Sequence, residues 1–227
     1  SPRPREHVAT APNQVWSWDI TYLKSAVRGS FFYLYLVEDV WSRTIVGWDV
    51  HDEESMEHAA TLIDRVAAET KIPRDRLVLH SDNGGPMKGS TMLATLQRLG
   101  IVPSFSRPHV SDDNPFSESL FRTMKYRPSY PRRPFASLSE ARTWVASFVA
   151  WYNTEHLHSG IGFVTPAQRH EGHDVAILQR RRGVYEAARR CRPERWARHT
   201  RAWKAVETVR LNPDVRTQRE TDRREAA

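Results

Sequence analysis

Three acidic residues stand in local sequences that could bring their carboxylates together. Asp19 follows Trp-Ser-Trp, Asp82 lies between Leu-His-Ser and Asn-Gly-Gly, and Glu118 follows Asn-Pro-Phe-Ser. Three converging carboxylates can hold two divalent cations about 3.5–4 Å apart, which activate an attacking oxygen and stabilise the leaving one in phosphoryl transfer. These residue types therefore indicate metal-dependent chemistry on phosphodiesters, with Asp19, Asp82 and Glu118 as both catalytic and metal-binding residues.

The surrounding sequence separates two of these acids from ordinary surface acids. The chain has 27 acidic residues, and most acidic side chains in proteins are simply solvated. Asp19 and Asp82, however, adjoin apolar runs at 20–23 and 77–79 that predict buried strands. A carboxylate at the end of a buried strand is costly to desolvate unless it is paired or bound to a cation. A cation shared by the two acids explains both positions.

A helix is expected to begin just after Asn114, because Asn is a favoured N-cap and Pro115 suits the first helical position. Glu118 then falls in the first turn, and Arg122 and Lys125 lie on the same face of the helix. One interpretation is an intrahelical ion pair, worth about 0.3–0.5 kcal/mol. The interpretation we favour is that Glu118 reaches the cations while Arg122 and Lys125 bind neighbouring DNA phosphates.

The elements that must position these residues predict a mixed α/β fold. Apolar and alternating runs predict strands, and a 3.6-residue apolar period predicts helices. The expected strands are 15–23, 30–40, 43–49, 76–80 and 101–105, and the expected helices are 55–70, 90–99, one from 115, and 137–153. A strand meander followed by alternating helix and strand is typical of a five-stranded mixed sheet flanked by helices.

Basic residues are concentrated at the C-terminal end of the chain. The net charge is +7 overall, but residues 1–179 carry −1 and residues 180–227 carry +8. A stripe of cations neutralises DNA phosphates, and interleaved indoles, here Trp196 and Trp203, can stack on exposed bases. The alternative is a solvated helix whose arginines pair with nearby acids. The candidate DNA contacts are Arg180, Arg181, Arg182, Arg189 and Arg190.

The rest of the composition limits the class of protein. The single cysteine, Cys191, permits neither an internal disulfide nor a Cys-rich zinc site, which is compatible with a reducing cytoplasm. No apolar run reaches the roughly 20 residues that cross a bilayer. Residues 1–5 include no apolar signal segment and no initiator Met, so we expect a piece of a longer protein.

Several stretches of the chain resemble one family of enzymes. They are residues 16–23, 37–43, 80–85 and 114–125, together with Trp151-Tyr152-Asn153, His158-Ser159 and Thr165-Pro166. Spread over residues 13–172, they are similar to the DDE transposases of bacterial insertion sequences with a retroviral-integrase-type catalytic core. The specific resemblance is to the group whose transposase is made by joining two overlapping reading frames. The chain departs from several relatives at His156, where they carry Arg.

The resemblance implies an RNase H-like fold that binds two Mg²⁺ ions, for which Mn²⁺ can substitute. Asp19 and Asp82 would ligate one ion, and Asp19 and Glu118 the other. A water, and then the freed 3′-hydroxyl of a mobile-element end, would attack a phosphodiester in line. The implied partners are double-stranded DNA, as element end and as target, and further copies of the chain on that DNA. The implied location is the bacterial cytoplasm, at the nucleoid when bound.

The chain is expected to have three parts. Residues 1–13 form a leader or linker, residues 14–174 form the integrase-type catalytic core with its helical extension, and residues 175–227 form the basic tail. The last 15 residues of the tail are polar and charged enough to predict disorder.

Two other functions stay open on the sequence alone. An RNase H-type nuclease would add another acid close to Asp82 and Glu118, and a domesticated DNA-binding protein would lack catalysis. Asp39, on the second expected strand, is the rival acid, which we place in a layer around the metal ligands.

Other polar residues have less definite roles. His80 and His109 could line the site, Asp112 and Asp113 fit a mobile loop before the Glu118 helix, and Asn153, His158 and Ser159 fit a structural turn or a DNA contact equally well. Trp16, Trp18, Trp41 and Trp48 alternate along strands and are expected in the core.

Overall fold

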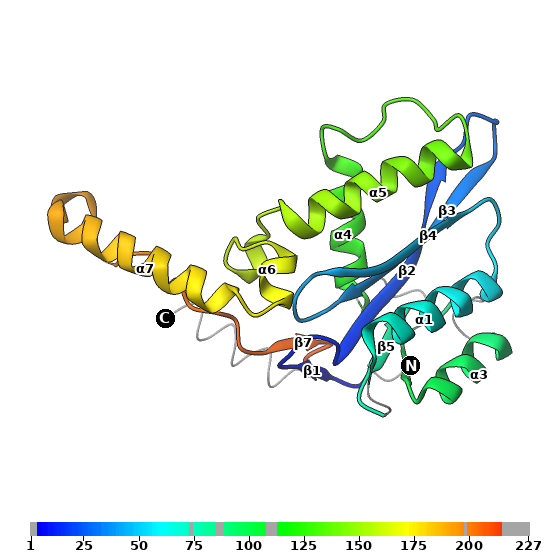
Figure 1. Ribbon diagram of the computed structural model, residues 1–227, viewed down its shortest axis with the longest axis horizontal. Helices are drawn as coiled ribbons and strands as arrows, with labels where there is room; N and C mark the ends of the chain where they lie inside the picture. Colours follow the sequence, from blue (N-terminus) through cyan, green and yellow to red (C-terminus); the bar gives the residue numbers. More distant parts are fainter. Residues whose placement is uncertain (1–3, 73–74, 85–88, 108–112, 198, 215–227) are drawn as a thin grey trace.

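A five-stranded mixed sheet forms the centre of the molecule (Figure 1). The computed structural model describes residues 4–72, 75–84, 89–107, 113–197 and 199–214. The sheet consists of β2 (Val15–Lys24), β3 (Phe31–Asp39), β4 (Ile45–His51), β5 (Val78–Ser81) and β6 (Val102–Phe105), in the order β4-β3-β2-β5-β6. β2, β3 and β4 form an antiparallel meander, whereas β5 runs parallel to β2 and β6 parallel to β5. The fold class predicted from the sequence is therefore confirmed.

Helices cover both faces of this sheet. The helices α1 (Met56–Thr70) and α3 (Ser90–Leu99) bury one face, with Trp16 and Trp18 in the core between them and the sheet. The helices α4 (Pro115–Tyr126) and α5 (Leu138–Thr154) bury the other face. Successive side chains of a strand point to opposite faces, so Asp19 lies on the same face as Leu23, which packs in the α4 and α5 core. This alternation places Asp19 on the side of the sheet that carries Glu118.

The expected elements agree with the observed ones to within a few residues. Ser55 and Ser137 cap α1 and α5 by accepting hydrogen bonds from the backbone N–H groups of Glu57 and Glu140. The strand expected at 43–49 is displaced to Ile45–His51. The displacement has a local cause, because Arg43 adopts a left-handed conformation, with φ of 69°, in the turn between β3 and β4.

Two short strands, one near each end of the described chain, pair beside the sheet. The short strand β1 (His7–Ala9) pairs antiparallel with β7 (Val209–Leu211), and both strands bury apolar side chains against Val15 and Val40. Between the sheet and β7, α6 (Pro166–His170) leads into α7 (Asp174–Cys191), which projects away from the sheet before the chain returns (Figure 1). One strand of the expected leader and one strand of the expected tail thus pair with each other against the core.

The disorder expected for the last 15 residues falls almost entirely outside the described residues. Only Pro213 and Asp214 of that stretch are described, so it stays a prediction.

Candidate active site

Asp19 and Asp82 lie side by side where the pairing between the parallel strands β2 and β5 ends. β2 and β5 pair from Val15 with Val78 to Trp18 with Ser81, and each acid immediately follows the last paired residue of its strand. Neighbouring strands are about 4.8 Å apart. Two residues that are 63 positions apart in the sequence are therefore brought to one edge of the sheet by strand register alone.

Hydrogen bonds fix the carboxylate of Asp82. Ser106, just after β6, donates its hydroxyl hydrogen to Asp82 Oδ1 at 3.1 Å, and the side chain of Asn114 forms a second hydrogen bond with the carboxylate. Burial raises the pKa of Asp82, and these two hydrogen bonds partly counteract the rise. Neither Ser106 nor Asn114 was singled out from the sequence as a residue that touches an acid of the site.

Asn114 also joins the helix of Glu118 to β2. It occupies the N-cap position of α4, but its side chain makes no capping hydrogen bond, which corrects the expected role. Its Oδ1 instead accepts a hydrogen bond from Ser17 Oγ at 2.5 Å, and its Nδ2 donates to the Trp18 carbonyl at 3.4 Å. A further hydrogen bond of 2.7 Å links the hydroxyls of Ser17 and Ser117. All these groups are buried, so the first turn of α4 is held firmly against β2.

Asp113 is a buried anchor, whereas the sequence placed it in a mobile loop. Its carboxylate accepts two hydrogen bonds from the Arg107 guanidinium, at 2.9 and 3.0 Å, and one from the Arg107 backbone N–H. Such a bidentate pair has both strength and a fixed geometry. Asp112 and His109, the other residues considered for this region, lie outside the described residues.

His80 supports the site from behind and is fully buried. Its Nε2 lies 2.9 Å from the carbonyl oxygen of Asp113, which can only accept, so this nitrogen carries the proton. Its Nδ1 then accepts from Ser104 Oγ at 2.9 Å. Burial lowers the pKa of His80 to about 4, so the ring is neutral at physiological pH. His80 therefore ties the strand before Asp82 to the residues before α4.

Repulsion among the acids is visible at Asp19. Its pKa is raised to about 7, first because the side chain is buried and then because Asp82 and Glu118 are near. The Ile20 backbone N–H donates to Asp19 Oδ1 at 2.8 Å and counteracts part of this rise. Within the described part of the chain, no three Asp, Glu, His or Cys side chains already lie close enough to hold one metal ion. The three acids are thus near neighbours without forming a closed ligand set.

The two basic residues on α4 differ in their surroundings. Lys125 donates from Nζ to Thr21 Oγ1 at 2.6 Å, two residues beyond Asp19 on β2. Burial lowers the pKa of Lys125, and attraction to Asp19 opposes that change. Arg122 is exposed and its guanidinium lies 5.8 Å from the Tyr126 ring. The structure brings Lys125 to the acidic site and leaves Arg122 on the helix surface.

Asp39 serves the turn after β3. Its carboxylate accepts hydrogen bonds from the Asn13 backbone N–H at 2.6 Å and from both the backbone N–H and the hydroxyl of Ser42 at 2.7 Å. Asp39 pairs with Trp16 across the sheet, which is three residues, or about 10 Å, from Asp19. The expected position beside the metal ligands is not supported.

The Trp151-Tyr152-Asn153 region is structural where its contacts are described. Asn153 bonds to both backbone groups of Ile45, at 2.9 and 3.0 Å, and so joins α5 to β4. His158 accepts a hydrogen bond from Gly160 N and caps the turn at Ser159–Ile161. His156 lies between the rings of Trp151 and Tyr152, with centroids 4.9 and 5.3 Å away.

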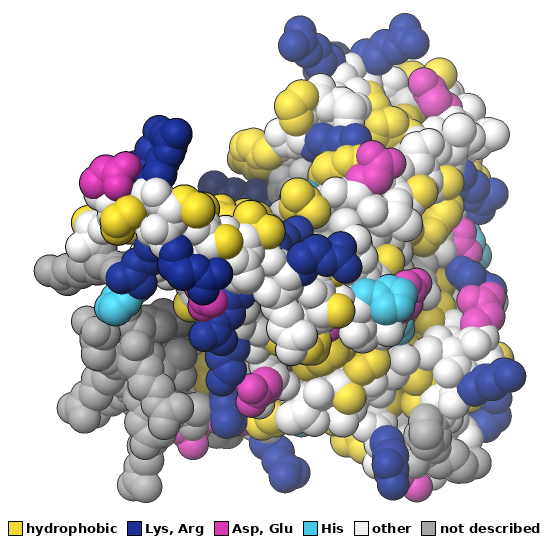
Figure 2. Space-filling model, turned by 60° about the vertical axis from the view of Figure 1, so that its left-hand side comes forward, with side chains coloured by type: hydrophobic (Ala, Val, Ile, Leu, Met, Phe, Trp, Pro, Cys, Tyr) yellow, Lys and Arg dark blue, Asp and Glu magenta, His cyan; other side chains and the backbone are white. Residues whose placement is uncertain are grey.

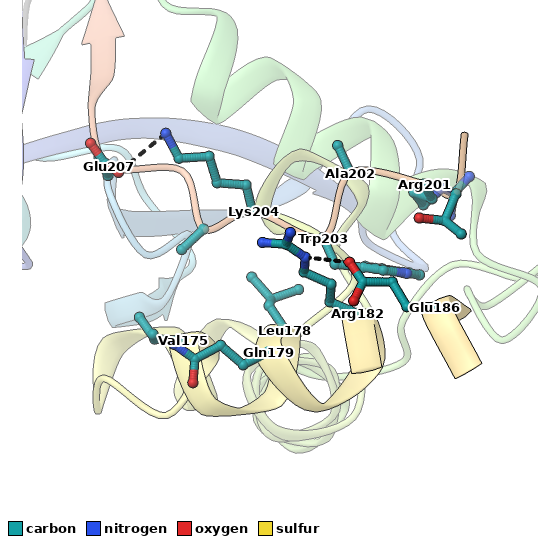
Figure 3. Close-up of a pocket in the computed structure, with 12 residues that line it drawn as sticks. Val175, Leu178, Gln179, Arg182, Glu186, Arg201, Ala202, Trp203, Lys204 and Glu207 are labelled. Atoms are coloured by element: carbon teal, nitrogen blue, oxygen red, sulfur yellow. Dashed lines mark hydrogen bonds and ion pairs between the residues drawn. The ribbon is translucent and has the colours of Figure 1, made fainter. Parts of the chain in front are cut away.

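The arginines of the tail lie on a separate part of the molecule, the arm formed by α7 and the returning segment 199–207. Figure 2 shows Lys and Arg side chains gathered on this arm, with acidic side chains among them. Arg182 pairs with Glu186 at 2.7 Å (Figure 3), and Arg181 donates to the Gly162 carbonyl at 2.8 Å. Arg180, Arg189 and Arg190 are exposed.

The arm's two indoles pack against neighbouring side chains. The Trp203 ring lies 5.2 Å from the Tyr185 ring and packs against the apolar cluster that contains Leu178. The Trp196 ring lies 5.8 Å from the same tyrosine. Stacking of Trp196 and Trp203 on bases stays a prediction.

Two matches to the integrase core domain decide the family. The integrase core domain matches the chain twice, at residues 9–111 and at residues 99–166. The chain belongs to the integrase core domain family. Among the helices of the described residues, none is long and apolar enough to span a membrane.

The curated relatives of this integrase core are insertion-sequence transposases. The transposase for insertion sequence element IS904 of Lactococcus lactis subsp. lactis (strain IL1403) is 32% identical over 161 residues, which cover 70% of this chain and 61% of the relative. Transposase InsF for insertion sequence IS3A of Escherichia coli (strain K12) is 30% identical over 165 residues, or 72% of this chain and 56% of the relative. The resemblance seen in the sequence is confirmed, and the chain spans less than two thirds of these relatives.

Solved integrase structures share the fold. The simian T-cell lymphotropic virus intasome in complex with PP2A regulatory subunit B56 gamma matches with a TM-score of 0.58 and 18% identity, covering 75% of this chain and 59% of that one. The HTLV-2 integrase catalytic core domain in complex with magnesium, in its dimeric form, matches with a TM-score of 0.51 and 15% identity, covering 70% and 97%. The RNase H-like fold expected from the sequence is thereby confirmed.

Proposed function

We propose that this chain is the catalytic region of an insertion-sequence transposase, which cleaves DNA at mobile-element ends and joins the freed 3′ end to target DNA. The main supporting observation is that Asp19 and Asp82 lie side by side where the parallel pairing of β2 with β5 ends, with the first turn of α4 bonded to β2 beside them. The relatives described above are named as transposases of insertion sequences.

Mg²⁺ fits the donor set of this site. Carboxylate oxygens are the hard ligands that Mg²⁺ prefers, and the raised pKa of Asp19, caused by burial and by Asp82 and Glu118, marks a cluster of charge that a divalent cation would neutralise. We assign Asp19 and Asp82 to one ion and Asp19 and Glu118 to a second, with Mn²⁺ as a substitute. When bound, such a pair activates the attacking oxygen and stabilises the leaving one.

The chain's own residues supply position and charge. Ser106 and Asn114 orient Asp82, and the buried contacts of Ser17 hold the first turn of α4, which carries Glu118, against β2. Lys125, held beside Asp19 by Thr21, binds the phosphate next to the scissile bond. A water, and later the 3′-hydroxyl of the element end, attacks directly. Alignment and charge stabilisation of this kind are enough for phosphoryl transfer.

DNA and further copies of the chain are the proposed partners. The related HTLV-2 core was solved in dimeric and trimeric forms, and an element with two ends requires at least two catalytic sites for concerted joining. We place this activity in the bacterial cytoplasm, at the nucleoid during reaction. Because the chain spans 56–61% of the first curated relatives, we assign selective recognition of element ends to sequence outside it.

A strand-transfer assay tests this function. The full chain is incubated with Mg²⁺ and fluorescent duplexes that carry candidate element ends, and products are separated on a denaturing gel. We expect products longer than the substrate, which only joining creates, and none with Asp19→Asn. Cleaved but unjoined DNA would indicate a nuclease, and bound but intact DNA would indicate a non-catalytic binding protein.

One acid that an RNase H-type nuclease could use is already engaged in other contacts. Asp113 is the additional acid near Asp82, and its charge contributes to the raised pKa of Asp82. Its carboxylate is already occupied by the bidentate hydrogen bonds from Arg107, which also lower the pKa of Asp113. It is therefore not available as the fourth acid that an RNase H-type nuclease would add.

A further inference from the structure

A basic groove of about 330 Å³ lies along β2 beyond Asp19. The side chains that give it its character are Tyr22, Lys24, Lys125, Tyr130, Arg132 and Arg133. No sequence motif pointed to Lys24 or to the two arginines, which come from the segment 127–137 between α4 and α5. Apart from Lys125, the groove lies outside the site described above.

The groove exists because β2 has an open edge. β5 stops pairing at Trp18, so the edge of β2 is uncovered from Asp19 onward. The segment 127–137 closes the far end of that edge, where Phe135 N donates to the Lys24 carbonyl and Ala26 N donates to the Phe135 carbonyl, both at 2.9 Å. Phe135 is buried in the α4 and α5 core.

The wall of the groove is also fixed. The Tyr130 ring packs edge-on against Trp144 with centroids 5.2 Å apart, and Trp144 Nε1 donates to the Ser129 carbonyl at 3.3 Å. The basic segment is thus anchored on both sides of Arg132 and Arg133. A ligand would meet a preformed surface.

The charge of the groove has one sign. Four of its lining side chains are cationic and none is acidic. Lys24, Arg132 and Arg133 are exposed, and among the described residues their side chains have no ion-pair partner. Unpaired cations in a row neutralise phosphates and release counterions on binding.

An aromatic side chain stands at the floor of the groove. Tyr22 is 52% exposed and sits on a platform of rings, with centroids 5.4 Å from Tyr33 and 5.7 Å from Phe31. Unpaired bases stack on exposed rings of this kind in proteins that bind single strands. From Asp19 to Lys24 is five residues of strand, or about 17 Å, which is long enough for several nucleotides.

We propose that this groove binds the unpaired end of a DNA strand as it leaves the acidic site: Lys24, Arg132 and Arg133 hold its phosphates, and a base stacks on Tyr22. This inference rests on the proposed function and adds the path of the substrate.

Anisotropy titrations with two fluorescent DNAs test the proposal. One is a blunt duplex, and the other is the same duplex with five unpaired thymidines at one 3′ end. Wild type should bind the tailed DNA more tightly. The double variant Arg132→Ser with Arg133→Ser should lose about tenfold in affinity for the tailed DNA and less than twofold for the blunt one. Tyr22→Ala should lose at least about fivefold on the tailed DNA only, and Tyr22→Phe should retain affinity.

The matched control removes the same charge elsewhere. The control is the double variant Arg76→Ser with Arg98→Ser, which changes two exposed positions outside the groove. It should change the affinities for the tailed and the blunt DNA by less than twofold each. Equal losses in the two double variants, or equal losses on both DNAs, would overturn the groove as a strand-binding site.

The strand-transfer assay separates this inference from the function beneath it. Wild type that joins DNA while Arg132→Ser with Arg133→Ser behaves like the control would refute the groove alone. The opposite outcome is a wild-type protein that does not join DNA but prefers the tailed DNA, with that preference lost in the groove variants. It would refute the proposed function and still support strand binding in the groove. Melting temperatures within about 2 °C of wild type would confirm that each exposed substitution leaves the fold intact.

Discussion

The acidic site and the arm are both polar, yet they are built in opposite ways. At the acidic site, Ser17, His80 and Asn114 are buried and each makes more than one hydrogen bond. On the arm, most arginines are exposed, and the ion pair of Arg182 with Glu186 joins side chains that are 67% and 43% exposed. The fold thus fixes the position of each polar side chain at the acidic site, whereas the arm supplies positive charge without fixing each side chain.

This difference sets the size of the effect that a substitution should have. A buried polar group that loses its partner costs about 1–3 kcal/mol, whereas an exposed i,i+4 pair contributes about 0.3–0.5 kcal/mol. Displacing a carboxylate at the acidic site also impairs the proposed catalytic reaction. Removing one arginine of the arm changes only the electrostatic potential that many charges create together. Substitutions in the two regions should therefore differ by orders of magnitude in activity.

The largest effect is expected from the acids themselves. Asp19→Asn, Asp82→Asn and Glu118→Gln should each reduce cleavage and strand transfer by more than about 100-fold, because each removes a charge that the proposed cations need. Duplex binding should stay within about twofold of wild type, as measured by anisotropy. A tenfold change in rate is only about 1.4 kcal/mol, so a variant that keeps more than a tenth of the wild-type rate would not have lost a metal ligand.

The residues that hold Asp82 should give the next largest effect. Ser106→Ala and Asn114→Ala should raise the Mg²⁺ concentration for half-maximal activity by about 10–100-fold, since residues that orient ligands typically have that influence on affinity. Ser147→Ala, on the exposed face of α5, removes a hydroxyl that bonds only to its own helix and is the control. A normal Mg²⁺ requirement in Ser106→Ala would mean that its 3.1 Å hydrogen bond to Asp82 does not orient the carboxylate.

Much of this site could be predicted from the sequence because its acids adjoin regular structure. Asp19 lies within an apolar strand, Asp82 directly follows one, and Glu118 lies in the first turn of a helix that begins with Pro115. Local pattern is enough to recognise each. The partners Ser106 and Asn114 could not be found in this way, since a buried Ser or Asn has no pattern of its own. Their roles depend on which strands become neighbours, which is a tertiary fact.

Predictions at the ends of the chain were less complete for a related reason. The charge of the tail is plain in the sequence, but the pairing of β1 with β7 joins residues about 200 positions apart through two three-residue strands. Such short strands have little local signal. The fully buried Arg169 likewise looked like an ordinary basic residue, yet it donates to the carbonyls of Trp41 and Val206 and pairs with Asp174, fixing the arm to the core.

A moderate effect on stability should follow from the charge of Asp19. Its pKa is about 7 in the fold and about 3.9 in an unfolded chain, so the stability that the protonated group contributes is present below pH 4 and lost as pH rises to 7. Without metal, Asp19→Asn should therefore raise the melting temperature at pH 8 by roughly 8–16 °C and leave it nearly unchanged at pH 4. Differential scanning fluorimetry in EDTA measures both.

Added Mg²⁺ provides the control for this prediction. It should raise the melting temperature of wild type at pH 8 more than that of Asp19→Asn, because bound ligand stabilises the state that binds it. Equal melting temperatures of the two proteins at pH 8 in EDTA would show that neither burial nor repulsion by Asp82 and Glu118 destabilises the charged form of Asp19 in the fold.

The smallest effect is expected from the arm. Replacing Arg180, Arg189 and Arg190 by Ser should weaken duplex binding only a few-fold and should lower the slope of log affinity against log salt by at most about 3, since each phosphate contact contributes roughly 0.9. Substitution is the appropriate change, because deleting residues 180–227 would also remove β7 and its buried side chains Val209 and Leu211.

The matched control replaces Arg65, Arg76 and Arg98, which lie outside the arm. Anisotropy titrations across a salt series would show an unchanged slope if the arm does not touch DNA. A slope that falls equally in the control would mean that only net charge matters, and a loss above about tenfold would mean that the arm, like the acidic site, depends on exact placement.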